Sequence, residues 1–525
     1  MKSLLQPDGR LFAPWEQPFA GPRPGAVATL TSAPGHPAQN GEYGLRLPAG
    51  GHPLAEPALS AALKQRVEEI EAAFALIEPV LRRLAPRQFD DGFPEQARRE
   101  LANSLGVDIP EAELESSWST PLDLGRIHAR CVLGTFCNLV ERGFDRNLAQ
   151  LLDEGESAEV LIRRFGFHAV DITSCSDGRL RGAVDFILRV PPAVVVWHDA
   201  YAGTMFDVEE ALHRWEAVEL RRWREGRPND ASEPTRYLKI GIYHLSSVDP
   251  RHKGCAGHGS DEVRAATALL GRLQEFEGAV ESTQCCDASA ATLLVGVDTD
   301  TDAIRVHVPD AAGNTDVDRF VSSATLYEQT ASLDREAAKE FIRHAVADCA
   351  GVHAADAATE GMRWLCGYLL KNNIGQVDAV LGWNGGTYAD AGHGEKLVVA
   401  GDALDDVQLR NLAYQAQMAT VEEAVVDLDV GIDVLGAMNG PRGLAVPVLV
   451  HVSYDERIPG ACARAQARAR RLAAAIEARY AAGTAGLLIQ VVVRAQGRSR
   501  LEVVEAESDG PPSMAAGGRR REARR

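Results

Sequence analysis

The feature that most constrains this chain is an alternation of short apolar segments and amphipathic segments between residues 155 and 300. Short apolar runs bounded by turn residues predict strands, and apolar stripes at intervals of three and four predict helices. The predicted strands are the run ending at Cys175, Ala183–Val190, Ala193–Trp197, 237–243 and Thr292–Val297, and the predicted helices are Ala158–Arg164, Val208–Glu225 and Asp261–Glu275. Such alternation predicts an α/β fold with a mostly parallel sheet, in which ligands collect at the carboxyl ends of the strands.

Two of these strand ends carry side chains that bind metals. The first strand opens into the loop Cys175-Ser176-Asp177-Gly178-Arg179, and the strand 237–243 leads to His244, with Cys255 eleven residues later in a glycine-rich loop. Two thiolates and one imidazole form a three-ligand zinc site, and an open fourth position is typical of catalytic zinc. We therefore expect Cys175, His244 and Cys255 to bind one Zn²⁺ per chain, and we expect this zinc to hydrate carbon dioxide.

Asp177 and Arg179 follow the first predicted ligand at alternate positions, so the three side chains can lean to one side of an extended loop. A carboxylate there can accept the proton of a zinc-bound hydroxide in a hydrogen bond and orient the hydroxide toward carbon dioxide. An arginine can pair with that carboxylate in forked geometry, keep it ionised and hold it off the metal. Gly178 between the two is expected to permit the turn. We predict Asp177 and Arg179 as the catalytic pair.

His252 and His258 are rival ligands, because they flank Cys255 at intervals of three residues. Ligands at such close spacing can bind zinc. A site drawn wholly from that loop would leave the loop 175–179 without a role. His244 therefore ranks first, and His258 stays as the second choice or as a proton carrier.

The residues before the sheet divide into two parts. Residues 1–52 are rich in proline and glycine, which predicts a disordered segment. From Pro57 apolar residues repeat at steps of three and four, and with further helical stretches they predict a helical domain over 53–152. Pro79 is expected to kink or split the first helix.

The region after the sheet contains a weaker repeat of the same pattern. His451 stands on an apolar strand and Cys462 lies eleven residues later, which is the spacing of the first histidine and cysteine. The segment Leu397–Asp402, which stands in place of the first ligand loop, contains no cysteine. We therefore expect 396–506 to be a degenerate duplicate, without metal, of a catalytic domain at 153–395.

Composition excludes several classes of function. The 525 residues carry a formal net charge of −19, which disfavours nucleic acid, since phosphate contacts need clustered lysine and arginine. The basic tail at 507–525 is the exception, and we expect it to be disordered. No apolar run approaches the ~20 residues that cross a bilayer, and the N-terminus has no secretory pattern, so we expect a cytosolic protein without membrane association. The scattered cysteines, Cys285 and Cys286 included, are expected to be free thiols or metal ligands.

The pattern Cys-x-Asp-x-Arg at 175–179, followed by His244 and the distant Cys255, resembles the carboxysomal (shell-associated) carbonic anhydrases. These enzymes form a divergent β-type family that was once set apart as an epsilon class. The segment Thr292–Val308 is also similar to that family. Ordinary β-carbonic anhydrases have the spacing His-x2-Cys, so the spacing of eleven residues here favours the carboxysomal branch.

The resemblance covers most of the chain and implies a helical N-terminal domain, a catalytic α/β domain and a degenerate C-terminal domain. It implies Cys175, His244 and Cys255 as zinc ligands, and Asp177 as proton acceptor paired to Arg179. It further implies a homodimer or trimer of dimers that interconverts carbon dioxide and bicarbonate. Such an enzyme would be packaged in a carboxysome with Rubisco and shell proteins as partners, and it would supply carbon dioxide to Rubisco.

Two other classes of function compete with this interpretation. The first is a zinc-stabilised scaffold of the carboxysome that has lost catalysis, but a purely structural zinc has no use for the pair Asp177 and Arg179. The second is a nucleobase deaminase, which needs His-x-Glu followed by Pro-Cys-x2-Cys. Neither deaminase element occurs in this sequence.

Overall fold

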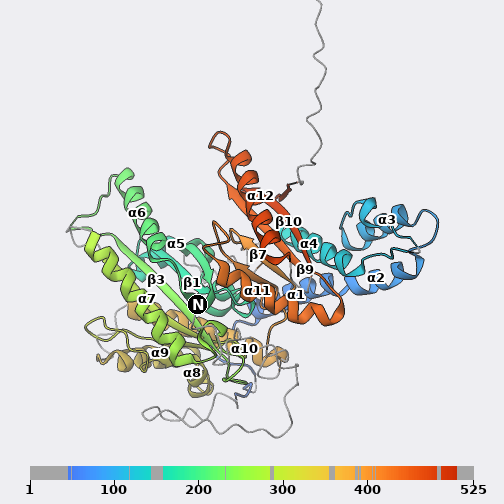
Figure 1. Cartoon of the computed structure of the whole chain (residues 1–525). Coiled ribbons are helices and arrows are strands. Elements are labelled where there is room, and N and C mark those ends of the chain that lie inside the picture. The colour runs from blue at the N-terminus through green and yellow to red at the C-terminus, as the bar shows by residue number, and fades with distance from the viewer. Residues whose placement is uncertain are drawn as a thin grey trace, which may run out of the picture.

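A computed structural model describes residues 45–504 apart from 49, 118, 144–157, 231, 284–288, 354–360, 385–387, 389–391, 405, 408 and 482–485. Of the segment 1–52 that was predicted to be disordered, residues 1–44 lie outside the described residues, as do 507–525, Cys285 and Cys286. Residues 45–52 are described apart from 49, and His52 is buried with its Nε2 3.1 Å from Thr330 Oγ1, so the ordered chain begins before the predicted boundary. Figure 1 shows a helical unit beside two α/β units, which agrees with the predicted multidomain α/β fold. No helix in the described ranges is long and apolar enough to span a membrane.

The helical unit contains α1 (Pro57–Ala75), α2 (Ile77–Leu84), α3 (Phe93–Leu105) and α4 (Leu124–Gly143). The predicted break is present, because α1 ends before Leu76 and Pro79 falls in the first turn of α2, where its missing N–H costs nothing. The buried side of these helices shares one apolar core with a face of the second sheet, including Leu449 and Val492.

The first sheet has the strand order β2-β1-β3-β4-β5-β6. Its strands are β1 (Ala169–Cys175), β2 (Val195–Tyr201), β3 (Arg236–Leu245), β4 (Ser289–Asp298), β5 (Ile304–His307) and β6 (Val321–Ser322). The four strands β2, β1, β3 and β4 are parallel, and β5 and β6 are antiparallel. The sheet is flanked by α5 (Ala158–Phe165), α6 (Val208–Arg224), α7 (Glu262–Thr283), α8 (Ser323–Thr330), α9 (Arg335–Ala350) and α10 (Met362–Asn384).

One predicted strand was wrong. The run expected as Ala183–Val190 is a short π-helix over Ala183–Leu188, bracketed by left-handed backbone at Gly182 (φ 88°) and Arg189 (φ 51°). One of its carbonyl groups bonds to a side chain of α10, since Asn373 Nδ2 donates to Ile187 O at 2.8 Å. A short, fully buried apolar run has no period that separates the two structures. The strand predicted at Ala193–Trp197 starts two residues later than expected, at Val195.

The second sheet repeats the topology of the first. Its order is β11-β10-β9-β7-β8, in which β8, β7, β9 and β10 are parallel and β11 is antiparallel. The elements are β7 (Leu397–Gly401), β8 (Ala413–Ala416), α11 (Val425–Asn439), β9 (Val446–Tyr454), α12 (Ala461–Tyr480), β10 (Leu487–Ala495) and β11 (Glu502–Val503). These strands and helices follow the order of β1, β2, α6, β3, α7, β4 and β5. The second α/β unit is thus a topological copy of the first.

Strand register aligns the copy with the first sheet residue by residue. Ile172 lies opposite Ile240, so the same register continued by four residues sets His244 opposite position 176, and in the copy His451 lies opposite Gly401. On this alignment Cys175, Asp177 and Arg179 correspond to Ala400, Asp402 and Leu404. The copy keeps the carboxylate and has lost the thiol and the guanidinium.

Candidate metal centre

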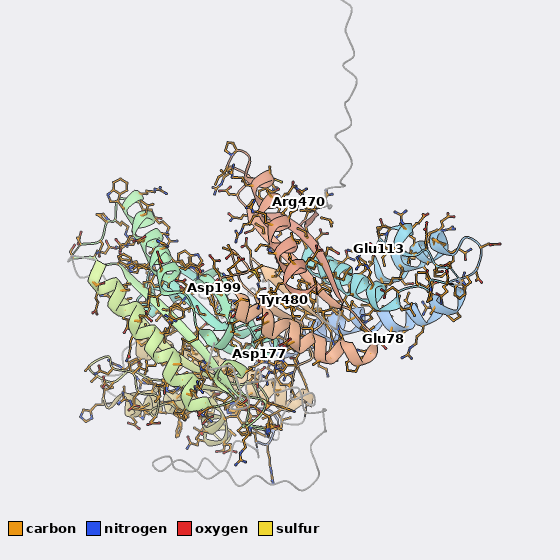
Figure 2. All side chains as sticks on the ribbon, viewed as in Figure 1. Glu78, Glu113, Asp177, Asp199, Arg470 and Tyr480 are labelled. Atoms are coloured by element: carbon orange, nitrogen blue, oxygen red, sulfur yellow. The ribbon has the colours of Figure 1, made fainter. Side chains whose placement is uncertain are left out.

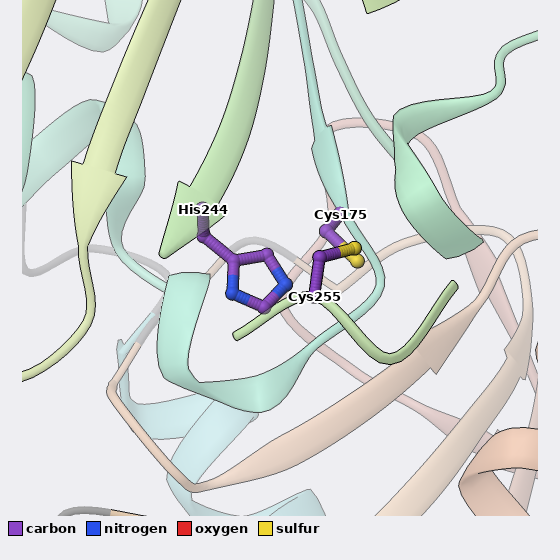
Figure 3. Close-up of side chains that lie close together, drawn as sticks. All are labelled: Cys175, His244 and Cys255. Carbon is purple, nitrogen blue, oxygen red and sulfur yellow. The ribbon is translucent and has the colours of Figure 1, made fainter. Parts of the chain in front are cut away.

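The ends of β1 and β3 and the loop after β3 bring three metal-binding side chains together. One ligand atom from each of Cys175, His244 and Cys255 lies within 4.8 Å of the others. Figure 3 shows the three side chains pointing toward one another, with Cys175 at the end of β1 and His244 near the end of β3. All three are buried, with exposed fractions of 5%, 1% and 2%.

The chemistry of these side chains fits a bound cation. Among the described residues, Nδ1 and Nε2 of the buried His244 ring have no hydrogen-bond partner, which is costly unless another group satisfies one of them. Hydrogen bonding to Cys255 lowers the pKa of the Cys175 thiol well below its usual value, and the same contact raises that of Cys255. Two sulfurs and an imidazole are the donors that zinc prefers, so the cluster is compatible with a metal site.

Asp177 and Arg179 form a buried forked ion pair beside this cluster. Arg179 Nε donates to Asp177 Oδ1 at 3.0 Å and Nη2 donates to Oδ2 at 2.7 Å. Asp177 Oδ2 also lies 3.6 Å from His244 Nε2. Burial alone would raise the pKa of Asp177, but the charges of Arg179, His393 and His244 outweigh it and hold that pKa well below its usual range. The carboxylate is therefore ionised and fixed in orientation.

Arg179 also ties this pair to the loop that carries Cys255. Its Nη1 donates to the carbonyl oxygen of Lys253 at 2.6 Å, two residues before that cysteine, and to Thr299 Oγ1 at 3.4 Å. One guanidinium thus joins the loop after β1 to the loops after β3 and β4. Arg179 has an exposed fraction of 1%, so water cannot replace these bonds.

His393 and Glu395, which sequence reasoning missed, lie against the same loop. Glu395 Oε1 accepts a hydrogen bond from Gly178 N at 3.1 Å and lies 2.9 Å from His393 Nδ1. Burial opposes charge on both residues, but their ion pair outweighs it, so the pKa of His393 is raised and that of Glu395 is lowered. With Asp177 they form a second group that could hold a metal ion. Both come from the segment before β7, which has no periodic pattern to mark it.

Gly178 is not needed for the turn, contrary to the expectation from the sequence. Its φ is not in the left-handed region, so the turn does not require glycine. A Cβ at this position would lie 2.4 Å from Glu395 Cγ and 2.6 Å from Glu395 Oε1. Glycine is needed here because the Glu395 side chain packs directly against the backbone.

Three models of one protein family match nearly all of the described chain. They are carboxysome shell carbonic anhydrase N-terminal (residues 52–144), catalytic domain (157–393) and C-terminal (394–508). The carboxysome shell carbonic anhydrase of Halothiobacillus neapolitanus is 40% identical over 435 residues, covering 82% of this chain and 84% of that protein. Proteins of the same name from Parasynechococcus marenigrum and Hydrogenovibrio crunogenus are 40% and 36% identical, covering 82% and 84% of this chain and 74% and 84% of those proteins.

This chain belongs to the carboxysome shell carbonic anhydrase family. The resemblance on which the sequence interpretation rests is thereby confirmed, and the matched catalytic and C-terminal models meet between residues 393 and 394. Glu395 thus comes from the part that matches the C-terminal model of the family, while Asp177 comes from the catalytic one.

The C-terminal family domain borders the cluster at several further points. Asn411 N donates to Gly178 O at 2.8 Å, and Gln415 N donates to Ser176 O at 3.3 Å. Asp427 Oδ2 accepts a hydrogen bond from Ser176 Oγ at 3.0 Å. Figure 2 shows Asp177 at the junction of the two α/β units. The C-terminal α/β unit therefore forms one wall of the candidate centre.

The rival ligands of the sequence interpretation do not join the cluster. His252 is exposed and its Nδ1 lies 2.9 Å from Asp249 Oδ1, while His258 Nε2 bonds to Gly203 O at 3.0 Å. In the copy, Cys462 Sγ accepts from Gln466 Nε2 at 3.5 Å, and His451 Nδ1 lies 2.8 Å from Asp402 O. Neither His451 nor Cys462 belongs to a metal-binding group among the residues that the structure describes.

Proposed function

We propose that this chain is a zinc-dependent carbonic anhydrase that interconverts carbon dioxide and bicarbonate in the carboxysome and supplies carbon dioxide to Rubisco. The chain is a carbonic anhydrase of this family, and it is located in the carboxysome. The proposed ligands are Cys175, His244 and Cys255, with one zinc per chain. The observation that carries the proposal is a fully formed, buried Asp177–Arg179 pair directly beside a two-sulfur, one-imidazole cluster.

Zinc bound at these residues would lower the pKa of a water molecule toward neutral and so supply hydroxide for attack on carbon dioxide. The protein's own contribution is orientation. Arg179 holds the Asp177 carboxylate in one position by two parallel bonds, and Asp177 Oδ2 would accept a hydrogen bond from the attacking hydroxyl group. Because the pKa of Asp177 is held low, this residue orients the nucleophile without storing the released proton.

The alternative is a carboxysome scaffold in which zinc is only structural. Zinc content together with stopped-flow carbon dioxide hydration on the purified full-length chain separates the two. We expect about one zinc per chain and rapid hydration. Zinc without hydration would refute the enzyme proposal and leave the scaffold.

Variants then test the roles of the residues. Cys175→Ser should lose both zinc and activity. Asp177→Asn should keep zinc and lower the hydration rate by on the order of 10²-fold or more, because the nucleophile loses its acceptor. Arg179→Ala should lower both rate and zinc affinity, since Arg179 also holds the Lys253 carbonyl near Cys255. Zinc loss in Asp177→Asn would show that Asp177 is structural.

The assembly and the division of the chain are parts of the same proposal. We propose a homodimer or trimer of dimers, with Rubisco and shell proteins as partners and with domains at 53–152, 153–395 and 396–506. Light scattering of the purified chain tests the oligomer. Binding assays with purified Rubisco, with and without residues 1–52, test the partner.

A further inference from the structure

Hydration of carbon dioxide releases one proton in every turnover, so a group must carry that proton from the metal site to solvent. A carrier works best when its pKa lies near the working pH. Asp177 is poorly suited to this task, because the Arg179 guanidinium holds both of its carboxylate oxygens. The question of which residue carries the proton rests on the proposed function.

A cleft of about 1120 Å³ lies between the two α/β units, and its walls contain chain neighbours and strand neighbours of the proposed ligands but not the ligands themselves. One wall contains Gly257 and His258, which follow Cys255 by two and three residues. Tyr201, the strand partner of Cys175 in the β1–β2 register, also lines this wall. The cleft therefore reaches the backbone beside two of the three proposed ligands.

The opposite wall of the cleft contains Asp427, in the first turn of α11. Its carboxylate is 8% exposed, with Oδ2 accepting from Ser176 Oγ at 3.0 Å and Oδ1 accepting from Ala202 N at 2.9 Å. Ser176 lies between Cys175 and Asp177 in the chain. Asp427 thus touches the ligand loop from one side and the cleft from the other.

We propose that Asp427 carries the proton between the metal site and the cleft. In hydration the proton leaves the attacking water, joins a carboxylate oxygen of Asp427 and then passes to a buffer base in the cleft, which regenerates the carboxylate. In bicarbonate dehydration the same transfers run in reverse. No electrons are exchanged and no other reactant is needed.

The surroundings of Asp427 suit this role. Unlike Asp177, which pairs with a guanidinium, Asp427 bonds to a hydroxyl and a backbone amide. Burial raises the pKa of Asp427 to about 7, and the charge of Cys175 adds to the rise, while the two hydrogen bonds oppose it. The side chain of Tyr414 on β8 interacts electrostatically with Asp427. The charged and titratable groups that line the cleft from other elements are Tyr201, Asp207, Glu209, Glu210, His213, His258, Arg264, Arg272, Glu275, Asp402, Glu423 and Arg468.

The second α/β unit would then have a task in turnover. Asp427 comes from α11, which corresponds to α6 of the catalytic unit, so the proton carrier is supplied by the degenerate domain. The copy would then provide chemistry as well as packing.

Asp427→Asn tests the proposal, because asparagine is nearly isosteric but cannot carry a proton. At low buffer concentration kcat for hydration should fall by on the order of 10²-fold, while kcat/KM and zinc content stay close to those of the wild type. Raising the concentration of imidazole should restore most of kcat. Glu423→Gln is the matched control, since Glu423 lines the same cleft but is exposed, and its carboxylate accepts from Ala419 N and Thr420 N. This variant should behave like the wild type.

A second measurement does not depend on activity. Difference infrared spectra across neutral pH should show protonated-carboxyl bands of Asp427 and of the buried Asp298 in the wild type and in Glu423→Gln, and the Asp427 band alone should be absent from Asp427→Asn. Wild-type kcat in Asp427→Asn, or an equal fall of kcat and kcat/KM without rescue by imidazole, would overturn the inference. Loss of zinc from Asp427→Asn would also overturn it. A wild-type protein that does not hydrate carbon dioxide would instead overturn the proposed function.

Discussion

Gly178→Ala should weaken metal binding although position 178 donates no ligand. The added Cβ would lie 2.4 Å from Glu395 Cγ, whereas ordinary contacts begin near 3.4 Å, so the Glu395 side chain or the loop must move by about 1 Å. Overpacking of this kind costs about 1–3 kcal/mol, and loss of the bond from Gly178 N to Glu395 Oε1 costs about as much again. Asn411 N and Gln415 N also bind the carbonyl groups of Gly178 and Ser176, so the loop cannot shift as a whole and is expected to distort next to Cys175.

Competition with a zinc chelator measures this effect. We expect the zinc affinity of Gly178→Ala to fall by about 10- to 100-fold, as for other groups that orient ligands. Gly271→Ala in α7 is the matched control, since a Cβ there meets nothing within 4 Å and alanine favours the helix by about 1 kcal/mol. In a Glu395→Ala background the same change at 178 should have little effect, because the clash is gone. Equal affinities for Gly178→Ala and Gly271→Ala, or an equal effect in both backgrounds, would refute the reasoning.

Two further outcomes are expected. Cys462→Ser should change neither zinc content nor hydration rate, because the Cys462 sulfur contacts Gln466 and lies in no metal-binding group of the described chain; a fall in zinc content would reveal a second site. Asp298→Asn should flatten the pH dependence of stability in acid, as measured by urea unfolding. Burial, and then Asp300, raise the pKa of Asp298 from 3.8 to about 6, so the folded protein binds this proton more tightly than the unfolded chain does. The free energy of unfolding of the wild type should therefore fall as pH rises from about 4 to about 6. An unchanged slope in Asp298→Asn would assign the dependence to other groups.

The proximity of Cys175, His244 and Cys255 could be predicted from the sequence because two of these residues stand at strand ends. Parallel strands share one carboxyl edge, so Cys175 and His244 had to meet once β1 and β3 were adjacent. The forked Asp177–Arg179 pair follows from alternate spacing within five residues. Such a local pattern does not depend on how distant parts of the chain pack.

The second wall of the site could not be predicted in the same way. Glu395 reaches Gly178 across 217 residues, and nothing near either residue marks the contact. Asp427 did leave a signal, as one of two aspartates in the otherwise apolar run from Ala424 to Val430, and a buried acid on a core helix favours a specific partner. The π-helix at Ala183–Leu188 was missed for the opposite reason, because an all-apolar run of that length fits either structure.

The long reach between Gly178 and Glu395 also sets the order in which the enzyme matures. In a growing chain the two cysteines and the histidine are synthesised well before residues 395, 411 and 427. Until those residues are present, the loop after Cys175 lacks the hydrogen bonds that they make to it. Stable metallation should therefore be a late event that waits for the C-terminal copy to fold against the loop. Truncation just before that copy should yield a polypeptide that carries all three donors and retains zinc poorly.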